Sequence, residues 1–193
     1  MFAMWKITQG VTNVSKPKVL ALVGGISKDS INRKLFAFFK EASKDKFDAE
    51  LFEIAELPHF SQDIENDPPA VAKEFKQRVK ESDAILIVTP EYNRSFPGVL
   101  KNALDWGSRP YGESVWGGKP AGLMGCSPGA IGTFGAQNQL KQVLSFLDLN
   151  LMRQPEFYLT FTEEMGQGKL SGRTESFLQK FIEAFAGWIE RSK

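Results

Sequence analysis

Three polar turns carry most of the side chains that could bind a small molecule. The first turn, Gly24–Asn32, holds the neutral donors Ser27, Ser30 and Asn32 between an apolar run and a segment with helical spacing. Backbone N–H groups at the start of a helix attract anions, and neutral donors beside them suit a phosphate monoester. An ordinary helix cap uses the same residue types, so that interpretation stays open for this turn alone.

The spacing of the first turn argues against two common nucleotide-binding motifs. It does not read G-x-x-x-x-G-K-[ST], the pattern of a P-loop NTPase. It does not read G-x-G-x-x-G either, so the Rossmann dinucleotide fingerprint is absent. A phosphate at this turn would therefore be held by neutral side chains and backbone amides.

The other two turns suit a flat ring. The second, Pro90–Pro97, offers Tyr92, Asn93 and backbone amides, which match a planar heteroaromatic group. The third, Ser127–Gly132, offers a hydroxyl and glycines that permit close approach of the backbone. Turns of Gly, Pro and Ser are common at strand ends, so each of them alone is weak evidence for a site.

These turns must be positioned by strands that alternate with helices. The unbroken apolar run 84–88 is typical of a strand buried on both faces of a parallel sheet. We expect strands at 18–23, 47–54, 84–88, 120–126 and 156–161, and helices that begin near Ile31, Pro69, Pro97, Phe134 and Phe177. We predict an α/β fold with a five-stranded parallel sheet in a three-layer α/β/α sandwich. The missing Rossmann fingerprint favours the flavodoxin-like strand order 2-1-3-4-5.

That strand order brings the three turns together. The carboxyl ends of strands one, three and four would lie side by side, and ligands of open α/β sheets bind at such ends. A phosphate at one end of the crevice and a flat ring at the other describe a mononucleotide. FMN is the usual occupant in a sheet of this order.

Composition excludes several classes of partner. The chain has 193 residues, with 24 Lys and Arg against 23 Asp and Glu, so it lacks the basic balance expected for binding nucleic acid or an anionic membrane. No apolar run approaches the roughly 20 residues that span a bilayer. A lone histidine, His59, argues against zinc, and the single cysteine, Cys126, which we expect to be a small buried residue, excludes an intramolecular disulfide.

We expect a cytoplasmic protein with one domain at 17–193. The first 16 residues lack a basic start followed by an apolar block, so they do not resemble a secretory signal. We interpret residues 1–16 as an N-terminal extension. Its Phe2 and Trp5 are expected to pack on the domain or on a partner subunit.

One long motif resembles a known family. Residues 89–93 read Thr-Pro-Glu-Tyr-Asn, and residues 95–106 read Ser-Phe-Pro-Gly-Val-Leu-Lys-Asn-Ala-Leu-Asp-Trp. Both are similar to the hallmark of the NAD(P)H-dependent FMN reductase family, which includes chromate, quinone and azo-dye reductases with a flavodoxin-like fold. The similarity extends over about Val19 to Tyr158. It implies FMN, an NAD(P)H cofactor, small electron acceptors and a homodimer or homotetramer.

The resemblance also implies roles for residues in each turn. Ser27, Ser30 and Asn32 would hold the FMN phosphate. The residues that would line the isoalloxazine ring are Pro90, Glu91, Tyr92 and Asn93. Those that would close its other side are Ser127, Pro128 and Gly129.

Three positions depart from the family pattern. The first turn usually reads Gly-Ser-x-Arg, whereas Gly25 and Ser27 stand here at the second and fourth positions. An arginine often found in the helix after the third turn is replaced by Gly135. Lys28 could supply a point charge, although it lacks the bidentate fork of arginine. These departures favour weaker FMN binding, with FMN behaving as an exchangeable substrate.

The activity implied is hydride transfer from NAD(P)H through FMN to quinones, free flavin or other acceptors in two half-reactions. The flavin carries this chemistry, so we name no catalytic side chain. Arg94 and Arg109 are candidates for contacting the phosphates of the nicotinamide cofactor, the alternative being solvated surface arginines. An electron carrier of the flavodoxin type or a flavin-binding module is the alternative function, although such carriers are usually strongly acidic. A homologue that has lost FMN is a third possibility.

Overall fold

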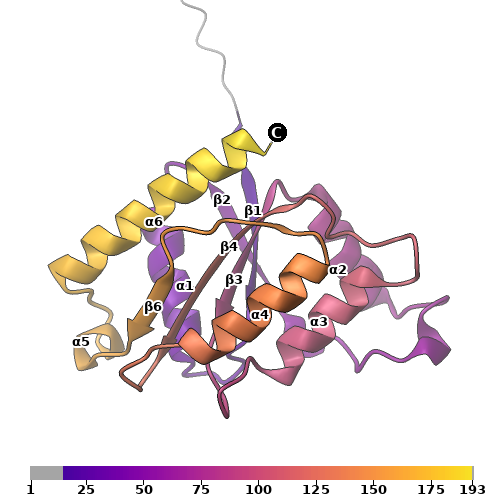
Figure 1. The fold of residues 1–193 in the computed structure, drawn as a ribbon, viewed down its shortest axis with the longest axis horizontal. Helices are drawn as coiled ribbons and strands as arrows, with labels where there is room; N and C mark the ends of the chain where they lie inside the picture. The colour runs from indigo at the N-terminus through magenta and orange to yellow at the C-terminus, as the bar shows by residue number, and fades with distance from the viewer. Residues whose placement is uncertain (1–14, 193) are drawn as a thin grey trace, which may run out of the picture.

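The computed structural model describes residues 15–192 of the chain (Figure 1). The expected N-terminal extension, with Phe2 and Trp5, lies almost entirely outside the described residues. The strands are β1 (Lys18–Val23), β2 (Asp48–Phe52), β3 (Ala84–Thr89), β4 (Pro120–Ser127), β5 (Asn150–Leu151) and β6 (Phe157–Thr160). The helices are α1 (Ile31–Ala42), α2 (Ala70–Glu81), α3 (Gly98–Ser108), α4 (Phe134–Phe146), α5 (Glu163–Gly166) and α6 (Gly172–Arg191), and two short 3₁₀ turns, η1 (Ile54–Glu56) and η2 (Gln62–Ile64), precede α2.

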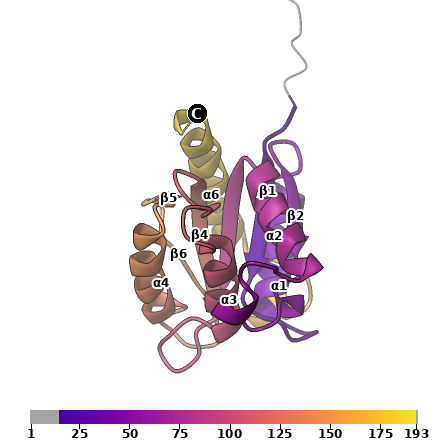
Figure 2. The ribbon, with the colours of Figure 1, turned by 90° about the vertical axis from the view of Figure 1, so that its right-hand side faces the viewer.

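The strands form one parallel sheet in the order β2-β1-β3-β4-β5, with β6 also paired to β4. The predicted flavodoxin-like order 2-1-3-4-5 is therefore confirmed. Figure 2 shows β2 and β1 toward one side of the molecule and β5 and β6 toward the other. The crossover helices lie on both faces, as right-handed connections between parallel strands require.

The fifth position of the sheet is shared by two short strands. Asn150 of β5 pairs with Pro120 at the start of β4, and Phe157 of β6 pairs with Met124 farther along the same strand. The chain between β5 and β6 leaves the sheet, and Pro155 in that gap has no N–H to donate to a ladder. The expected strand 156–161 thus corresponds to β6, whereas β5 is too short to give an apolar run.

Two hydrophobic cores fill the space between the layers. Val19, Ala21 and Val23 of β1 face α1 and α6, whereas Leu20 and Leu22 face α2, α3 and α4. Figure 1 shows α1 and α6 together on one side of the strands and α3 and α4 on the other. Every residue from Ala84 to Val88 is fully buried, as predicted from its unbroken apolar run. This double burial fixes the strand ends from which the three turns project.

The start of α2 agrees with the helix expected near Pro69. Helix α2 has Pro69 as its N-cap with no side-chain cap bond, and Asp67 instead pairs with Lys73 at 3.0 Å. The helix buries Ala72, Phe75 and Val79, and the partly buried Val71 packs against the same core.

Candidate functional site

The three turns meet at the carboxyl edge of the sheet, which faces downward in Figure 1. The first and second turns touch: Gly24 N donates to Val88 O at 2.9 Å, and a Cβ on Gly24 would lie 3.2 Å from Pro90 Cδ and from Pro97 Cγ. The second and third turns enclose a shallow hollow of about 300 Å³. The residues that line this hollow are Glu91, Asn93, Arg94, Ser127, Pro128, Gly129, Ile131 and Gly132.

The first turn is shaped by the N-cap of α1. Ser30 Oγ accepts a hydrogen bond from Arg33 N at 3.4 Å, and only 8% of Ser30 is exposed. A Cβ on Gly25 would lie 2.1 Å from Ser30 Oγ. A side chain at position 25 would therefore push the Ser30 hydroxyl out of its capping position. The departure at Gly25 is accommodated by the way this chain caps α1.

The backbone of the first turn offers unused donors. Within residues 15–192, the N–H groups of Ile26, Ser27 and Lys28 donate to no protein acceptor. Ser27 is exposed beside them, and its carbonyl accepts from Ser30 N at 3.1 Å. Free backbone amides in a turn that leads into a helix can donate to phosphate oxygens, so the chemistry of this turn fits a phosphate monoester.

Asn32 lies behind the turn and ties α1 to β4. Its Nδ2 donates to Cys126 O at 2.9 Å, and Cys126 N donates to Asn32 Oδ1 at 2.9 Å. Only 1% of Asn32 is exposed. The side chain is thus engaged with the protein backbone, and its contact with a phosphate stays a prediction.

The second turn is a tight hairpin with left-handed backbone. Tyr92 and Ser95 exchange two backbone hydrogen bonds of 2.9 Å, and Asn93 and Arg94 between them have φ values of 52° and 64°. Two positive φ angles are the signature of a type I′ turn, in which Asn is favoured. Gln139 of α4 holds the turn, since it donates to Arg94 O at 3.0 Å and accepts from Ser95 Oγ at 2.7 Å. Sequence reasoning missed Gln139, because no local pattern marks a polar contact 44 residues away.

Glu91 joins the second turn to α4 by hydrogen bonds. Its Oε2 accepts from Ala136 N at 3.0 Å, and its Oε1 accepts from Arg94 Nη1 at 3.0 Å. A carboxylate is favourable at the N-terminus of a helix because of the unpaired N–H groups there. A Cβ on Gly135 would lie 3.1 Å from Glu91 Oε2 and 3.2 Å from Arg94 O. The third departure from the family pattern, Gly135, thus leaves room for these contacts.

The third turn is folded against β6. The Ser127 hydroxyl donates to Gly132 O, and Thr160 Oγ1 donates to Gly129 O at 3.3 Å. Gly132 has φ 59°, and a Cβ there would lie 2.9 Å from Leu159 N, so only glycine fits. Because Ser127 is satisfied within the turn, the exposed backbone at Pro128 and Gly129 is what this side of the hollow presents.

Arg109 is not among the residues that line the hollow, and its contact with a phosphate of the nicotinamide cofactor stays a prediction. Arg109 is the residue after α3. Its guanidinium donates to Glu65 at 2.8 and 3.1 Å and lies 3.8 Å from the centre of the Tyr111 ring. This hydrogen-bonded pairing lowers the pKa of Glu65 below its usual range. Arg94 remains at the hollow, with its side chain 71% exposed.

Cys126 precedes the third turn but is fully buried. Burial raises the pKa of its thiol to about 12, which leaves it a protonated, inert side chain. The expectation of a small buried residue is confirmed. Among residues 15–192, no group of three or more His, Cys, Asp or Glu side chains is placed to hold a metal ion.

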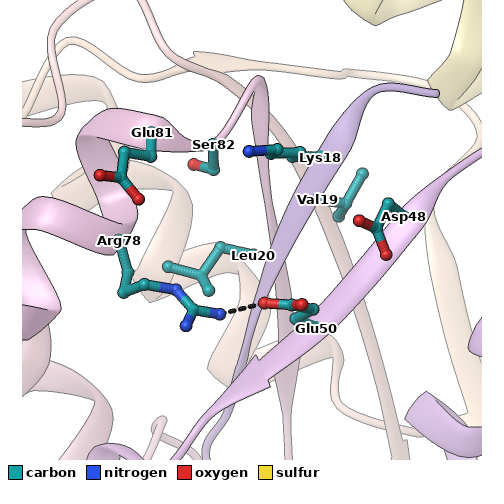
Figure 3. Close-up of a pocket in the computed structure, with 8 residues that line it drawn as sticks. All are labelled: Lys18, Val19, Leu20, Asp48, Glu50, Arg78, Glu81 and Ser82. Atoms are coloured by element: carbon teal, nitrogen blue, oxygen red, sulfur yellow. Dashed lines mark hydrogen bonds and ion pairs between the residues drawn. The ribbon is translucent and has the colours of Figure 1, made fainter. Parts of the chain in front are cut away.

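A second hollow lies at the opposite edge of the sheet (Figure 3). It is lined by the starts of β1 and β2 and the end of α2, and the Arg78–Glu50 ion pair spans it. Its volume is about 260 Å³. Ligands of doubly wound sheets bind at the carboxyl ends of strands, so this amino-end hollow is a poor candidate for the cofactor site.

Residues 17–164 match the family described as NADPH-dependent FMN reductase. The chain belongs to this family. It is 46% identical over 175 residues to a 2-hydroxy-1,4-benzoquinone reductase from Burkholderia sp., which covers 89% of this chain and 96% of the relative. It is 45% identical over 178 residues to a quinone reductase from Pseudomonas putida, covering 91% of this chain and 96% of that protein.

A solved structure agrees with the sequence comparisons. The flavoenzyme NAD(P)H:(acceptor) oxidoreductase FerB from Paracoccus denitrificans superposes with a TM-score of 0.88 at 41% identity, over 91% of this chain and 98% of that one. The family predicted from residues 89–106 is confirmed, and with it the FMN and NAD(P)H cofactors. No helix within residues 15–192 has the length and apolar character needed to cross a membrane.

Proposed function

We propose that the chain transfers a hydride from NAD(P)H through FMN to quinones, with free flavin and other small compounds as further acceptors. The observation that carries this proposal is the meeting of three turns at one sheet edge, with free amides on the first and a hollow between the other two. The names of the two curated relatives reported above support a quinone as acceptor.

We assign the FMN phosphate to the first turn and the ring to the hollow. The backbone amides near Ser27 and the Ser30 cap bind the phosphate, with Asn32 behind them. The residues assigned to one side of the ring are Pro90, Glu91, Tyr92 and Asn93, and those assigned to the other are Ser127, Pro128 and Gly129. Weaker retention of FMN still follows from the missing arginine of the first turn.

The side chains of the site orient the bound molecules and exclude water, and they do not themselves react. The chemistry that FMN supplies when bound is acceptance of a hydride from NAD(P)H and delivery of electrons to an acceptor. Glu91 is occupied by Ala136 N and Arg94, and the Cys126 thiol is protonated, so neither is free to act as a base or nucleophile. The role of the hollow is therefore to hold two flat molecules in the correct relative orientation, and an acid or base is not required.

The rim of the hollow suits flat apolar acceptors. Tyr92 is 55% exposed and Ile131 is 48% exposed, one on the second turn and one on the third. Arg94 beside them has 71% of its side chain exposed and is the candidate for binding a phosphate of the nicotinamide cofactor. Planar quinones can pack on such side chains without a dedicated hydrogen-bond pattern, which favours a broad range of acceptors.

We further propose a cytoplasmic homodimer or homotetramer. Phe146, near the end of α4, is 88% exposed, and burial of such a side chain in a subunit contact would be favourable. Light scattering during size-exclusion chromatography gives the mass directly. A monomer at micromolar concentration would contradict this assembly.

The visible spectrum tests the proposed function. The purified protein is mixed with FMN under anaerobic conditions, and NADH or NADPH is added before a benzoquinone. We expect the flavin bands to collapse with the nicotinamide and to return with the quinone, at rates far above those of a mixture without protein. Bound flavin that stays oxidised would indicate an electron carrier, and no flavin binding would indicate a homologue that shares the fold alone.

A further inference from the structure

An arginine outside the predicted site grips the backbone of the first turn. Arg33 Nε donates to Gly25 O at 3.2 Å. Its two terminal nitrogens donate to the two carboxylate oxygens of Glu53 at 2.8 and 2.5 Å. Glu53 directly follows β2, whose last residue Phe52 pairs with Leu22 of β1. The guanidinium therefore spans from the end of β2 to the start of the turn after β1.

The hydrogen bond from Arg33 to Gly25 O sets the direction of the Ile26 N–H. A trans peptide is planar, so its C=O and N–H point in opposite directions. With Gly25 O held toward Arg33, the N–H of Ile26 points away from it, and that N–H has no protein acceptor within residues 15–192. The backbone N–H of Arg33 also donates to the Ser30 cap. Arg33 thus contacts both ends of the turn whose free amides face outward.

The turn needs such a constraint because of its composition. Gly24 and Gly25 lose more backbone freedom on ordering than any other residue would. A cation in the first turn of a helix is unfavourable with the helix dipole, and the partly buried, two-point pair with Glu53 offsets that cost. The carboxylate of Glu53 takes up the charge of the guanidinium, and the third contact, to Gly25 O, acts on the backbone.

We propose that Arg33 is a positioning residue for the phosphate of FMN. With Glu53 it holds the Gly25 carbonyl so that the amides after it face the phosphate, and it does not itself contact the phosphate. This inference rests on the proposed placement of the phosphate in the first turn. It deepens that placement, because it names the side chain that compensates for the missing arginine and serine of the family pattern.

The test compares binding of FMN with binding of riboflavin, which has the same ring and no phosphate. Dissociation constants are measured by quenching of flavin fluorescence for the natural chain and for Arg33→Gln, Arg33→Lys and Glu53→Gln. Arg78→Gln is the matched control, because Arg78 pairs with Glu50 and also ties β2 to a helix, at the opposite edge of the sheet (Figure 3). Circular dichroism and the thermal midpoint report folding separately.

We expect Arg33→Gln to weaken FMN binding about tenfold, the loss of one charge-assisted hydrogen bond, and to leave riboflavin binding unchanged. Arg33→Lys recovers little, since an ammonium cannot hold a carboxylate at two points and a carbonyl together. Glu53→Gln weakens FMN binding by about threefold in the same direction, the difference between a charged and a neutral partner. Arg78→Gln leaves the dissociation constants of both FMN and riboflavin unchanged. If Arg33→Gln does not fold, the other two variants carry the test.

Three results would overturn the inference. Tighter FMN binding by Glu53→Gln would mean that Arg33, once released, contacts the phosphate directly. If Arg33→Gln weakened the binding of FMN and of riboflavin equally, Arg33 would have a general structural role. Natural protein that binds riboflavin as tightly as FMN would contradict the placement of the phosphate itself, and this failure is distinguishable because it appears before any substitution.

Discussion

Asn32 shows how a single buried amide supports the site from behind. Both of its polar atoms are matched to the backbone of Cys126, the residue before Ser127. Because β4 ends in the third turn and α1 begins at the first, this one side chain fixes the distance between two parts of the site. The Asn32 side chain therefore stabilises the fold by bonding the backbone, rather than by donating directly to a ligand.

Replacement of Asn32 tests that view. Asn32→Ala leaves Cys126 N and Cys126 O without partners in the core, and we expect a loss of about 2–4 kcal/mol in the free energy of unfolding. Urea titration measures this loss. Asn138→Ala is the control, since that side chain bonds only the carbonyl of Phe134 on the helix surface. Equal losses in the two variants would contradict the role of Asn32 as the tie between α1 and β4.

At the scale of elements, the loop after β3 and helix α4 act as one unit. Glu91 caps α4, and Gln139 from the same helix bonds the Arg94 carbonyl and the Ser95 hydroxyl. The hollow is therefore bounded by a helix terminus and a turn that are fixed to each other. Gly135 allows this contact, because any side chain there would press on the Glu91 carboxylate.

A double-mutant cycle measures this coupling. In an ordinary helix, Gly→Ala gains up to about 1 kcal/mol of stability. We expect Gly135→Ala to gain much less, because its Cβ would lie 3.1 Å from Glu91 Oε2, and to recover part of the gain when Glu91 is already alanine. Chemical unfolding of the two single variants and the double variant gives the interaction energy. Additive effects would show that Gly135 and Glu91 do not depend on each other.

The sequence predicted the elements better than their contacts. The run 84–88 identified a strand buried on both faces, and residues 89–106 identified the family, because both signals are local. The split edge of the sheet was missed, since the two residues of β5 have no pattern of their own. The pairing of Arg109 with Glu65 was missed for a different reason: Glu65 lies 44 residues earlier, and only the fold brings the two residues together. Arg33 and Gln139 escaped notice for the same reason.

The molecule as a whole distributes its charged pairs around the edges of the sheet. Arg33–Glu53 lies at the carboxyl end, Arg109–Glu65 ties the chain after α3 to the loop before α2, and Lys141–Glu156 joins α4 to the split edge. In each pair the hydrogen bond from the cation lowers the pKa of the glutamate below its usual value of 4.5. Because of these pairs, the stability of the domain depends on pH in the acidic range.

The sign of that dependence follows from proton binding. A carboxylate whose pKa is lower in the folded state binds fewer protons there, so its stabilising effect is complete above the unfolded pKa near 4.5 and is lost as pH falls through the folded pKa. We therefore expect the thermal midpoint to change little between about pH 5 and 7 through these groups and to fall steadily below that range. Glu65→Gln removes one of the pairs and flattens the acid limb of the curve. Glu190→Gln removes a carboxylate that forms no ion pair within residues 15–192 and keeps the natural slope. An acid limb for Glu65→Gln that runs parallel to that of the natural protein would mean that the Arg109–Glu65 pair adds no pH-dependent stability.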